Sequence, residues 1–131
     1  MVRAFEYHVI GELLGVRRDL LESIEFVESA LVESVVKSGL TLFDVLTKKK
    51  PNGGVLSIAI IGESHAAVHT WPESESLTVS ISSCKDSDST WSVFWELKKH
   101  FRAKDHKAVE IRSGIVLSER IEEKLLMNAM V

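Results

Sequence analysis

The feature that most constrains the fold of this chain is a series of strand-like segments between Thr41 and Ser83. Apolar and β-branched residues fill each segment, and residues typical of turns separate one segment from the next. In the last segment apolar and hydroxyl residues alternate, as in a strand with one face in water. The segments run from Thr41 to Thr47, Val55 to Ile61, Ala66 to Trp71 and Leu77 to Ser83.

Helical patterns flank these strands. Between Arg17 and Ser38 apolar residues recur at helical spacing, with glutamates opposite and Gly39 as a C-terminal cap. A second helix is expected from a cap at Asp88 or Ser89 to about Phe101, with its aromatic residues against the sheet. Further strands are expected from Phe5 to Leu14 and from Lys107 to Ile115, and a helical tail from Glu119 to about Met127.

This order of elements predicts an α+β fold with a single domain over residues 1–131. The expected architecture is a two-layer α/β sandwich, in which helices cover one face of a mostly antiparallel sheet. With 45% hydrophobic and 27% charged residues the composition is that of a globular domain. The order of the strands within the sheet does not follow from the sequence.

Charge and cysteine content restrict the partners and the location. The formal net charge is −3, and the one basic cluster, Lys48 to Lys50, is interpreted as a solvated loop, with steering of an anion as the alternative. A nucleic-acid partner would need a broader basic face, so none is expected. No apolar run approaches the roughly 18 residues of a membrane span. The single cysteine, Cys84, favours a reducing compartment, and a cytoplasmic protein is predicted.

The densest group of reactive side chains lies between two predicted strands, from Glu63 to Glu73. A Ser-His hydrolase could pair Ser64 with His65 or His69, but it would need an orienting group and an oxyanion hole. A metal site could use the two histidines with Glu63 or Glu73, although i and i+4 diverge on a strand. On spacing alone, a polar turn with satisfied histidines remains the simplest interpretation.

The string Glu63-Ser64-His65, followed by His69-Thr70-Trp71-Pro72-Glu73 and by Cys84, resembles the pyruvoyl-dependent S-adenosylmethionine decarboxylases of bacterial and archaeal type. The resemblance covers about Glu6 to Ile115 and includes a histidine near the N-terminus, His8. It implies a proenzyme that cuts itself between Glu63 and Ser64 and converts Ser64 into a covalent pyruvoyl cofactor. That ketone would condense with the substrate amine as a Schiff base and accept electrons when carbon dioxide leaves.

The resemblance also implies roles for individual residues. His69 matches the base of self-processing, and Cys84 matches the acid that returns a proton to the substrate carbon. Glu73 matches a carboxylate near the substrate, and His65 and Trp71 are expected beside it. The family further implies a homodimer of processed protomers with sites at the subunit contact, S-adenosylmethionine as the substrate, a product used in polyamine synthesis, and no metal.

Three positions depart from the family pattern. Lys49 or Lys50 replaces a phenylalanine expected to contact adenine, which bears on adenosine recognition. A hydroxyl expected before the cleavage site falls on Leu56, unless Ser57 takes its place by a slip of one residue. Lys85 replaces the glycine after Cys84. The alternatives are therefore an arginine or ornithine decarboxylase of the same family, or a regulatory paralogue that does not process itself.

Overall fold

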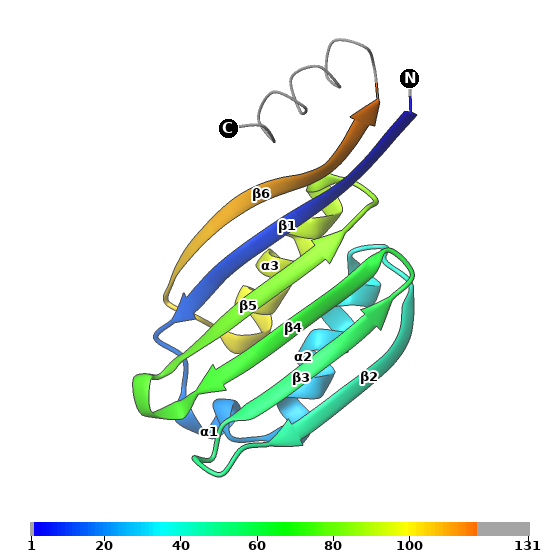
Figure 1. Cartoon of the computed structure of the whole chain (residues 1–131). Helices are drawn as coiled ribbons and strands as arrows, with labels where there is room; N and C mark the ends of the chain where they lie inside the picture. Colours follow the sequence, from blue (N-terminus) through cyan, green and yellow to red (C-terminus); the bar gives the residue numbers. More distant parts are fainter. Residues whose placement is uncertain (1, 118–131) are drawn as a thin grey trace.

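Alternating burial along the predicted strands produces one sheet with a covered face and an open face. The structure, a computed structural model, describes residues 2–117 (Figure 1). Its sheet has the strand order β2-β3-β4-β5-β1-β6, and every neighbouring pair is antiparallel. The strands are β1 Val2–Leu14, β2 Leu42–Lys49, β3 Val55–Ile61, β4 Ser64–Trp71, β5 Ser76–Ser83 and β6 Asp105–Leu117.

Two long helices lie side by side against one face of this sheet, behind it in the view of Figure 1. They are α2 (Ile24–Lys37) and α3 (Ser87–Phe101), and two short helices, α1 (Arg18–Leu21) and η1 (Pro72–Ser74), lie at the ends of strands. The core between the layers is mostly apolar and includes the fully buried Leu31 of α2, Phe94 of α3 and Val68 of β4. The predicted two-layer α+β fold is confirmed.

The single helix predicted from Arg17 to Ser38 is wrong in detail. The chain forms two helices that break before Ser23, because the Ser23 hydroxyl accepts a hydrogen bond from the Phe26 N–H (3.1 Å) and starts α2 as its N-cap. The cap of α3 is likewise Asp86, not Asp88 or Ser89. Periodicity reveals the apolar stripe of a helix, whereas the break depends on one local side-chain contact.

Three other expectations need correction. Lys48 and Lys49 belong to β2 instead of a solvated loop, and Ser64 is the first residue of β4. Trp95 of α3 is 40% exposed, so this aromatic residue does not join the core. The predicted helical tail, Glu119 to Met127, lies outside the described residues. None of the helices in the described part of the chain is long and apolar enough to cross a membrane.

The first strand is inserted into the second half of the chain. β1 pairs with β5 on one side and with β6 on the other, so the N-terminal strand lies between two strands that come after residue 75. The turn at Gly62 and Glu63 joins β3 to β4 at one end of the sheet, and η1 lies at the opposite end of β4. Strand β4 therefore runs across the middle of the open face from Ser64 to Trp71 (Figure 1).

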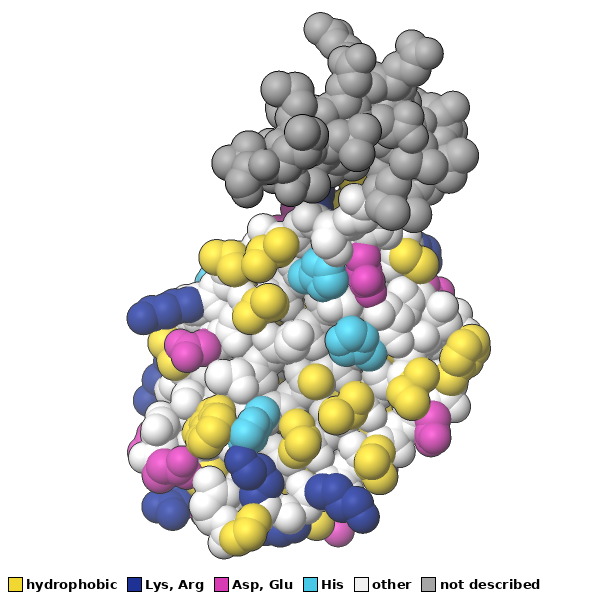
Figure 2. All heavy atoms as spheres, in the orientation of Figure 1, with side chains coloured by type: hydrophobic (Ala, Val, Ile, Leu, Met, Phe, Trp, Pro, Cys, Tyr) yellow, Lys and Arg dark blue, Asp and Glu magenta, His cyan; other side chains and the backbone are white. Residues whose placement is uncertain are grey.

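Three rows of side chains cross all six strands on the open face of the sheet, since residues directly opposite each other in the register share a face. Figure 2 views this face and shows apolar side chains and histidines spread over it. The middle row is almost entirely apolar, and the outer rows contain the histidines. From β2 to β6 the rows are Asp44, Ile60, His65, Ser82, His8, Ile111; then Leu46, Ile58, Ala67, Ser80, Ile10, Val109; then Lys48, Leu56, His69, Thr78, Glu12, Lys107.

Candidate active site

The turn between β3 and β4 presents Ser64 in an unusual backbone conformation. Its φ angle is +157°, at the edge of the positive range that residues with a side chain rarely adopt. The Ser64 Oγ lies 3.0 Å from Nδ1 of the neighbouring His65 and shares a hydrogen bond with it. This serine is therefore constrained in its main chain and has a possible proton acceptor next to its hydroxyl.

The residue before Ser64 is held through both its carbonyl and its carboxylate. The Glu63 carbonyl oxygen accepts a hydrogen bond from the main-chain N–H of Cys84 at 3.0 Å. The Glu63 carboxylate accepts hydrogen bonds from the N–H (2.9 Å) and the hydroxyl (3.2 Å) of Thr41. The Thr41 N–H lowers the pKa of Glu63 from its ordinary value. A donor thus already points at the oxygen that would gain negative charge if Ser64 attacked this carbonyl.

A cavity of about 500 Å³ opens beside the peptide bond between Glu63 and Ser64. Glu63, Ser64, Cys84 and Ser113 line it, together with residues at the start of β1. The thiol of Cys84 is exposed, in contrast to the buried position usual for an inert free cysteine. The volume falls in the range of small-molecule sites. Three of the residues expected to act together, Glu63, Ser64 and Cys84, are therefore brought to one cavity.

His8 joins this end of the sheet through two hydrogen bonds. Its Nδ1 lies 2.7 Å from the Ser82 hydroxyl, and its Nε2 lies 2.7 Å from the hydroxyl of Ser113, which lines the cavity. This arrangement could not be predicted from the sequence, because the three residues lie on three different strands, and β1 is far from β5 and β6 along the chain. Knowledge of the strand order, which places β1 between β5 and β6, would have been needed to find it.

The opposite end of β4 holds a second group of residues around His69. The His69 ring stacks on Trp71 with 4.0 Å between ring centroids, and its Nε2 contacts the ammonium of Lys50. Burial, and then the charge of Lys50, lower the pKa of His69 below the ordinary 6.5, while Glu73 acts in the raising direction. Glu73 lies on η1, at the end of this strand. His69 is therefore held neutral, as a base needs to be before it acts.

The two groups are far apart within one copy of the chain. His69 follows Ser64 by five positions along the extended strand, a distance of roughly 16 Å at 3.3 Å per residue. His69 follows His65 by four positions, and the resulting distance of roughly 13 Å is too long for a shared metal ion. No group of three potential metal ligands occurs among residues 2–117. Within the described residues only His65, and not His69, reaches the Ser64 hydroxyl.

Comparison with known proteins decides the family. The family profile described as S-adenosylmethionine decarboxylase matches residues 7–114, most of the chain. This chain belongs to the S-adenosylmethionine decarboxylase family. The S-adenosylmethionine decarboxylase proenzyme of Carboxydothermus hydrogenoformans is 34% identical to it over 94% of this chain and 97% of that protein. The proenzyme of Pelotomaculum thermopropionicum is 33% identical over 88% of this chain and 92% of that protein.

A solved structure of the same family supports the fold. The adenosylmethionine decarboxylase of Aquifex aeolicus superposes with a TM-score of 0.82, covering 90% of this chain and 98% of that one, at 23% sequence identity. At this identity the likeness establishes the architecture alone. The α+β fold predicted from the order of the elements is thus found in a member of the S-adenosylmethionine decarboxylase family.

The strand register also locates the hydroxyl that the family pattern places before the cleavage site. Leu56 lies on the open face directly opposite His69. Ser57 points to the covered face, where it is fully buried and shares a hydrogen bond with the Thr47 hydroxyl (2.8 Å). A slip of one residue would reverse every side chain of β3. Ser57 therefore does not replace the missing hydroxyl, and this chain has leucine at that point of the open face.

Proposed function

We propose that this protein is a pyruvoyl-dependent S-adenosylmethionine decarboxylase that cuts itself between Glu63 and Ser64. The observation that carries the proposal is the main-chain N–H of Cys84 on the Glu63 carbonyl, beside a cavity that the Cys84 residue also lines. Membership of the family and the names of the proenzyme relatives agree with it. The reaction would give the aminopropyl donor for spermidine synthesis.

Self-cleavage follows from the chemistry of Glu63 and Ser64. The Ser64 Oγ attacks the Glu63 carbonyl carbon, its proton passes to a base, and the Glu63–Ser64 C–N bond breaks as the nitrogen takes up a proton. The resulting ester loses the α-proton of Ser64, and the C–O bond breaks to release the Glu63 carboxylate. Residue 64 then loses ammonia by hydrolysis and becomes a pyruvoyl group. The Cys84 N–H stabilises the charge that develops on the carbonyl oxygen during the attack.

The residues around the cavity fit such a group. A pyruvoyl ketone supplies an electron-accepting carbonyl for decarboxylation of an amino acid. The exposed Cys84 thiol lines the same cavity as Ser64, so it can return a proton to the substrate carbon. Ser113, held by His8, adds a hydroxyl to the wall of the cavity. No metal ligand is needed for these steps.

A second copy of the chain would complete the site. His69, the base that the family implies, lies roughly 16 Å along β4 from Ser64, and Trp71 and Glu73 lie beyond it. If two copies stack their open faces about a two-fold axis that runs across the strands, β4 faces its counterpart end for end. The row of His65 then lies against the partner's row of His69, which brings each Ser64, the neighbour of His65, to the partner's His69 end. We infer a homodimer in which the processing base and part of the substrate contacts come from the partner subunit.

The composition of the open face supports this stacking. An isologous contact must be complementary to itself, and the axis described above brings the apolar middle row against its own copy. Three members of that row are exposed apolar residues: Ile10 is 46%, Leu46 60% and Val109 58% exposed. Two sheets that pack face to face lie about 10 Å apart, close enough for side chains of the outer rows to meet.

Intact-mass measurement of the purified protein, beside a Ser64→Ala control, tests the proposal. Two fragments, 1–63 and 64–131, are expected, with the second lighter by one ammonia than a fragment that begins with serine. The processed protein should release carbon dioxide from S-adenosylmethionine, with arginine and ornithine as control substrates. An uncut wild-type chain would reject the proposed function, and cleavage with turnover of arginine or ornithine alone would reject the substrate.

A further inference from the structure

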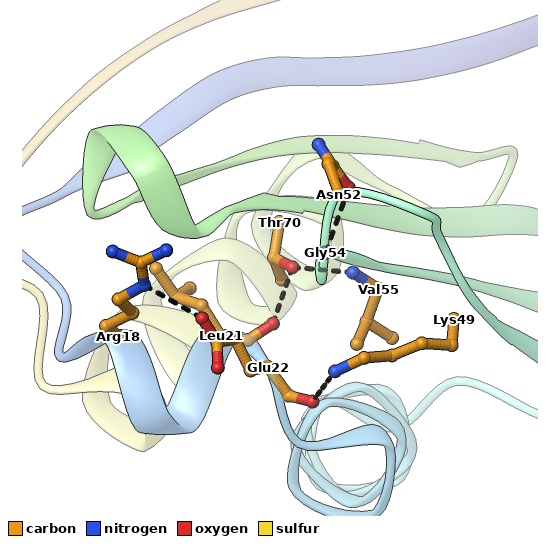
Figure 3. Close-up of polar contacts among 8 residues, drawn as sticks. All are labelled: Arg18, Leu21, Glu22, Lys49, Asn52, Gly54, Val55 and Thr70. Carbon is orange, nitrogen blue, oxygen red and sulfur yellow. Dashed lines mark hydrogen bonds and ion pairs between the residues drawn. The ribbon is translucent and has the colours of Figure 1, made fainter.

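The lysine run at the end of β2 is divided between the two faces of the sheet. Side chains alternate along a strand, so Lys48 lies in the open-face row of His69, and the Lys49 ammonium donates to the Glu22 carbonyl on the helix side (Figure 3). Lys50, the next residue, returns to the open face and contacts His69. Of these three lysines, only Lys50 touches a residue that the proposed chemistry uses.

The main chain around Lys50 is held firmly. Lys50 N–H donates to the Gly54 carbonyl (2.7 Å), and the Lys50 carbonyl accepts from the Gly53 N–H (3.0 Å). Figure 3 shows how the far side of this turn is tied down: the buried Thr70 hydroxyl accepts from the Val55 N–H at 2.8 Å and donates to the Leu21 carbonyl at 2.7 Å. The position of Lys50 is therefore determined by a hydrogen-bonded turn.

The Lys50 ammonium makes two contacts on the open face. It meets Nε2 of His69, and it lies over the ring of Trp71 at 4.6 Å from the centroid, a distance at which a cation and an aromatic face attract. Trp71 in turn stacks on His69. The three side chains thus fix one another, with the imidazole between an ammonium at its edge and an indole at its face.

The chemistry of an ammonium group determines the state of His69. An ammonium carries donors only, so Nε2 must accept and the ring proton must lie on Nδ1. Protonation of His69 would put an N–H against the Lys50 charge. We propose that Lys50 is a positioning residue that holds His69 in its neutral, Nδ1-protonated form and restrains its basicity. This inference rests on the proposed function only in one respect, namely that His69 acts as the base of self-processing.

The other charged groups near His69 do not replace Lys50. Glu73, on η1, acts in the opposite direction and raises the pKa of His69. Lys48 and Glu12 lie in the same open-face row, on β2 and β1, but make no contact with the ring. After burial, Lys50 is the largest influence that lowers the pKa of His69. Lys48 therefore provides a matched control: the same side chain, on the same face, without the contact.

Nuclear magnetic resonance titration of the His69 imidazole tests the inference without any enzymatic activity. The measurement uses the uncut Ser64→Ala protein, with ¹⁵N-labelled histidine and His69→Gln for assignment. In that background Lys50→Met should raise the His69 pKa and weaken the preference for Nδ1–H. Lys48→Met should leave both unchanged, and Lys50→Arg, which keeps a charged donor, should preserve the wild-type state.

Three results would overturn the inference: an unchanged His69 in Lys50→Met, an equal effect of Lys48→Met, or a Lys50→Arg variant that behaves like Lys50→Met. In the self-cleaving chain, Lys50→Met should cleave more slowly than wild type below the ordinary histidine pKa. Above it, Lys50→Met should cleave faster than wild type, because His69 without the Lys50 ammonium beside it is a stronger base. If the plots of cleavage rate against pH for wild type and Lys50→Met do not cross, that result would also count against the proposal. If the wild-type chain does not cleave, the proposed function fails while the titration still decides the role of Lys50.

Discussion

The two ends of strand β4 differ in how they hold reactive groups. At the Ser64 end the reactive groups are positioned mainly by the main chain, through the positive φ angle of Ser64 and the hydrogen bond from the Cys84 N–H to the Glu63 carbonyl. At the His69 end side chains hold one another, through stacking on Trp71 and the ammonium of Lys50. In the proposed mechanism the first end presents the peptide bond that is cut, and the second end presents the base.

This difference shows that one strand can carry both halves of a reaction without joining them. A strand is rigid and rises about 3.3 Å per residue, so its two ends cannot meet within one copy. A strand that faces its own copy end for end has no such restriction. Under the proposed function, the segment from Glu63 to Glu73 provides two half-sites on one strand and not a single site.

The largest expected effect comes from separating the two ends by mutation. Ser64→Ala and His69→Ala should each prevent or slow self-cleavage, by about 10² to 10⁴-fold for loss of a base. When both variants are expressed together, the His69→Ala chain should be cut again, because a mixed dimer holds one complete pair of ends. Mass spectrometry of differently tagged chains reports which chain is cut.

The control for this mixture is the double variant Ser64→Ala, His69→Ala expressed with His69→Ala, which should stay uncut. If the two single variants together also remain uncut, His69 does not act across the subunit contact. The Ser64 end and the His69 end of β4 would then not be two parts of one active site.

A smaller effect should separate the main chain of Cys84 from its thiol. Cys84→Ala keeps the N–H on the Glu63 carbonyl, so it should still cleave, yet decarboxylation should fall by about 10² to 10³-fold because the proton donor is lost. Cleavage by intact mass and carbon dioxide release measure the two steps separately. Full turnover by this variant would remove the thiol from the reaction.

The smallest effect is expected at His65, the neighbour of the Ser64 hydroxyl. His65→Phe removes the 3.0 Å contact at an exposed position opposite Ile60, where a larger apolar side chain fits. Self-cleavage should slow by about tenfold, the worth of one hydrogen bond to the nucleophile. A rate equal to that of His69→Ala would instead make His65 the base, and the His69 end would then serve only the substrate.

Sequence patterns predicted the fold better than the site. A β-branched, apolar run between glycines placed β3 at its observed bounds, Val55–Ile61. Helical spacing located α2 and α3, because a helix packed on a sheet leaves a clear periodicity. The resemblance selected Glu63, Ser64 and Cys84, which do share a cavity.

The remaining features depend on strand order and register, which a single sequence does not encode locally. The contact of His8 with Ser113 exists only because β1 pairs with β6. The contact of Lys50 with His69 depends on the registers of both β2 with β3 and β3 with β4. A run of three lysines gives no sign that its members point to different faces. The 16 Å between Ser64 and His69 likewise became evident only once both were placed on one extended strand.

The insertion of β1 between β5 and β6 affects how the protein can refold before and after cleavage. A proenzyme refolds as one chain, so its pairing of β1 with later strands is an intramolecular event at a high effective concentration. Cleavage after Glu63 would place β1 and its two neighbours on separate polypeptides, interlocked but no longer joined. Refolding would then become a second-order encounter that slows on dilution. The processed protein would thus stay assembled while folded, but once unfolded it could no longer refold as a single chain.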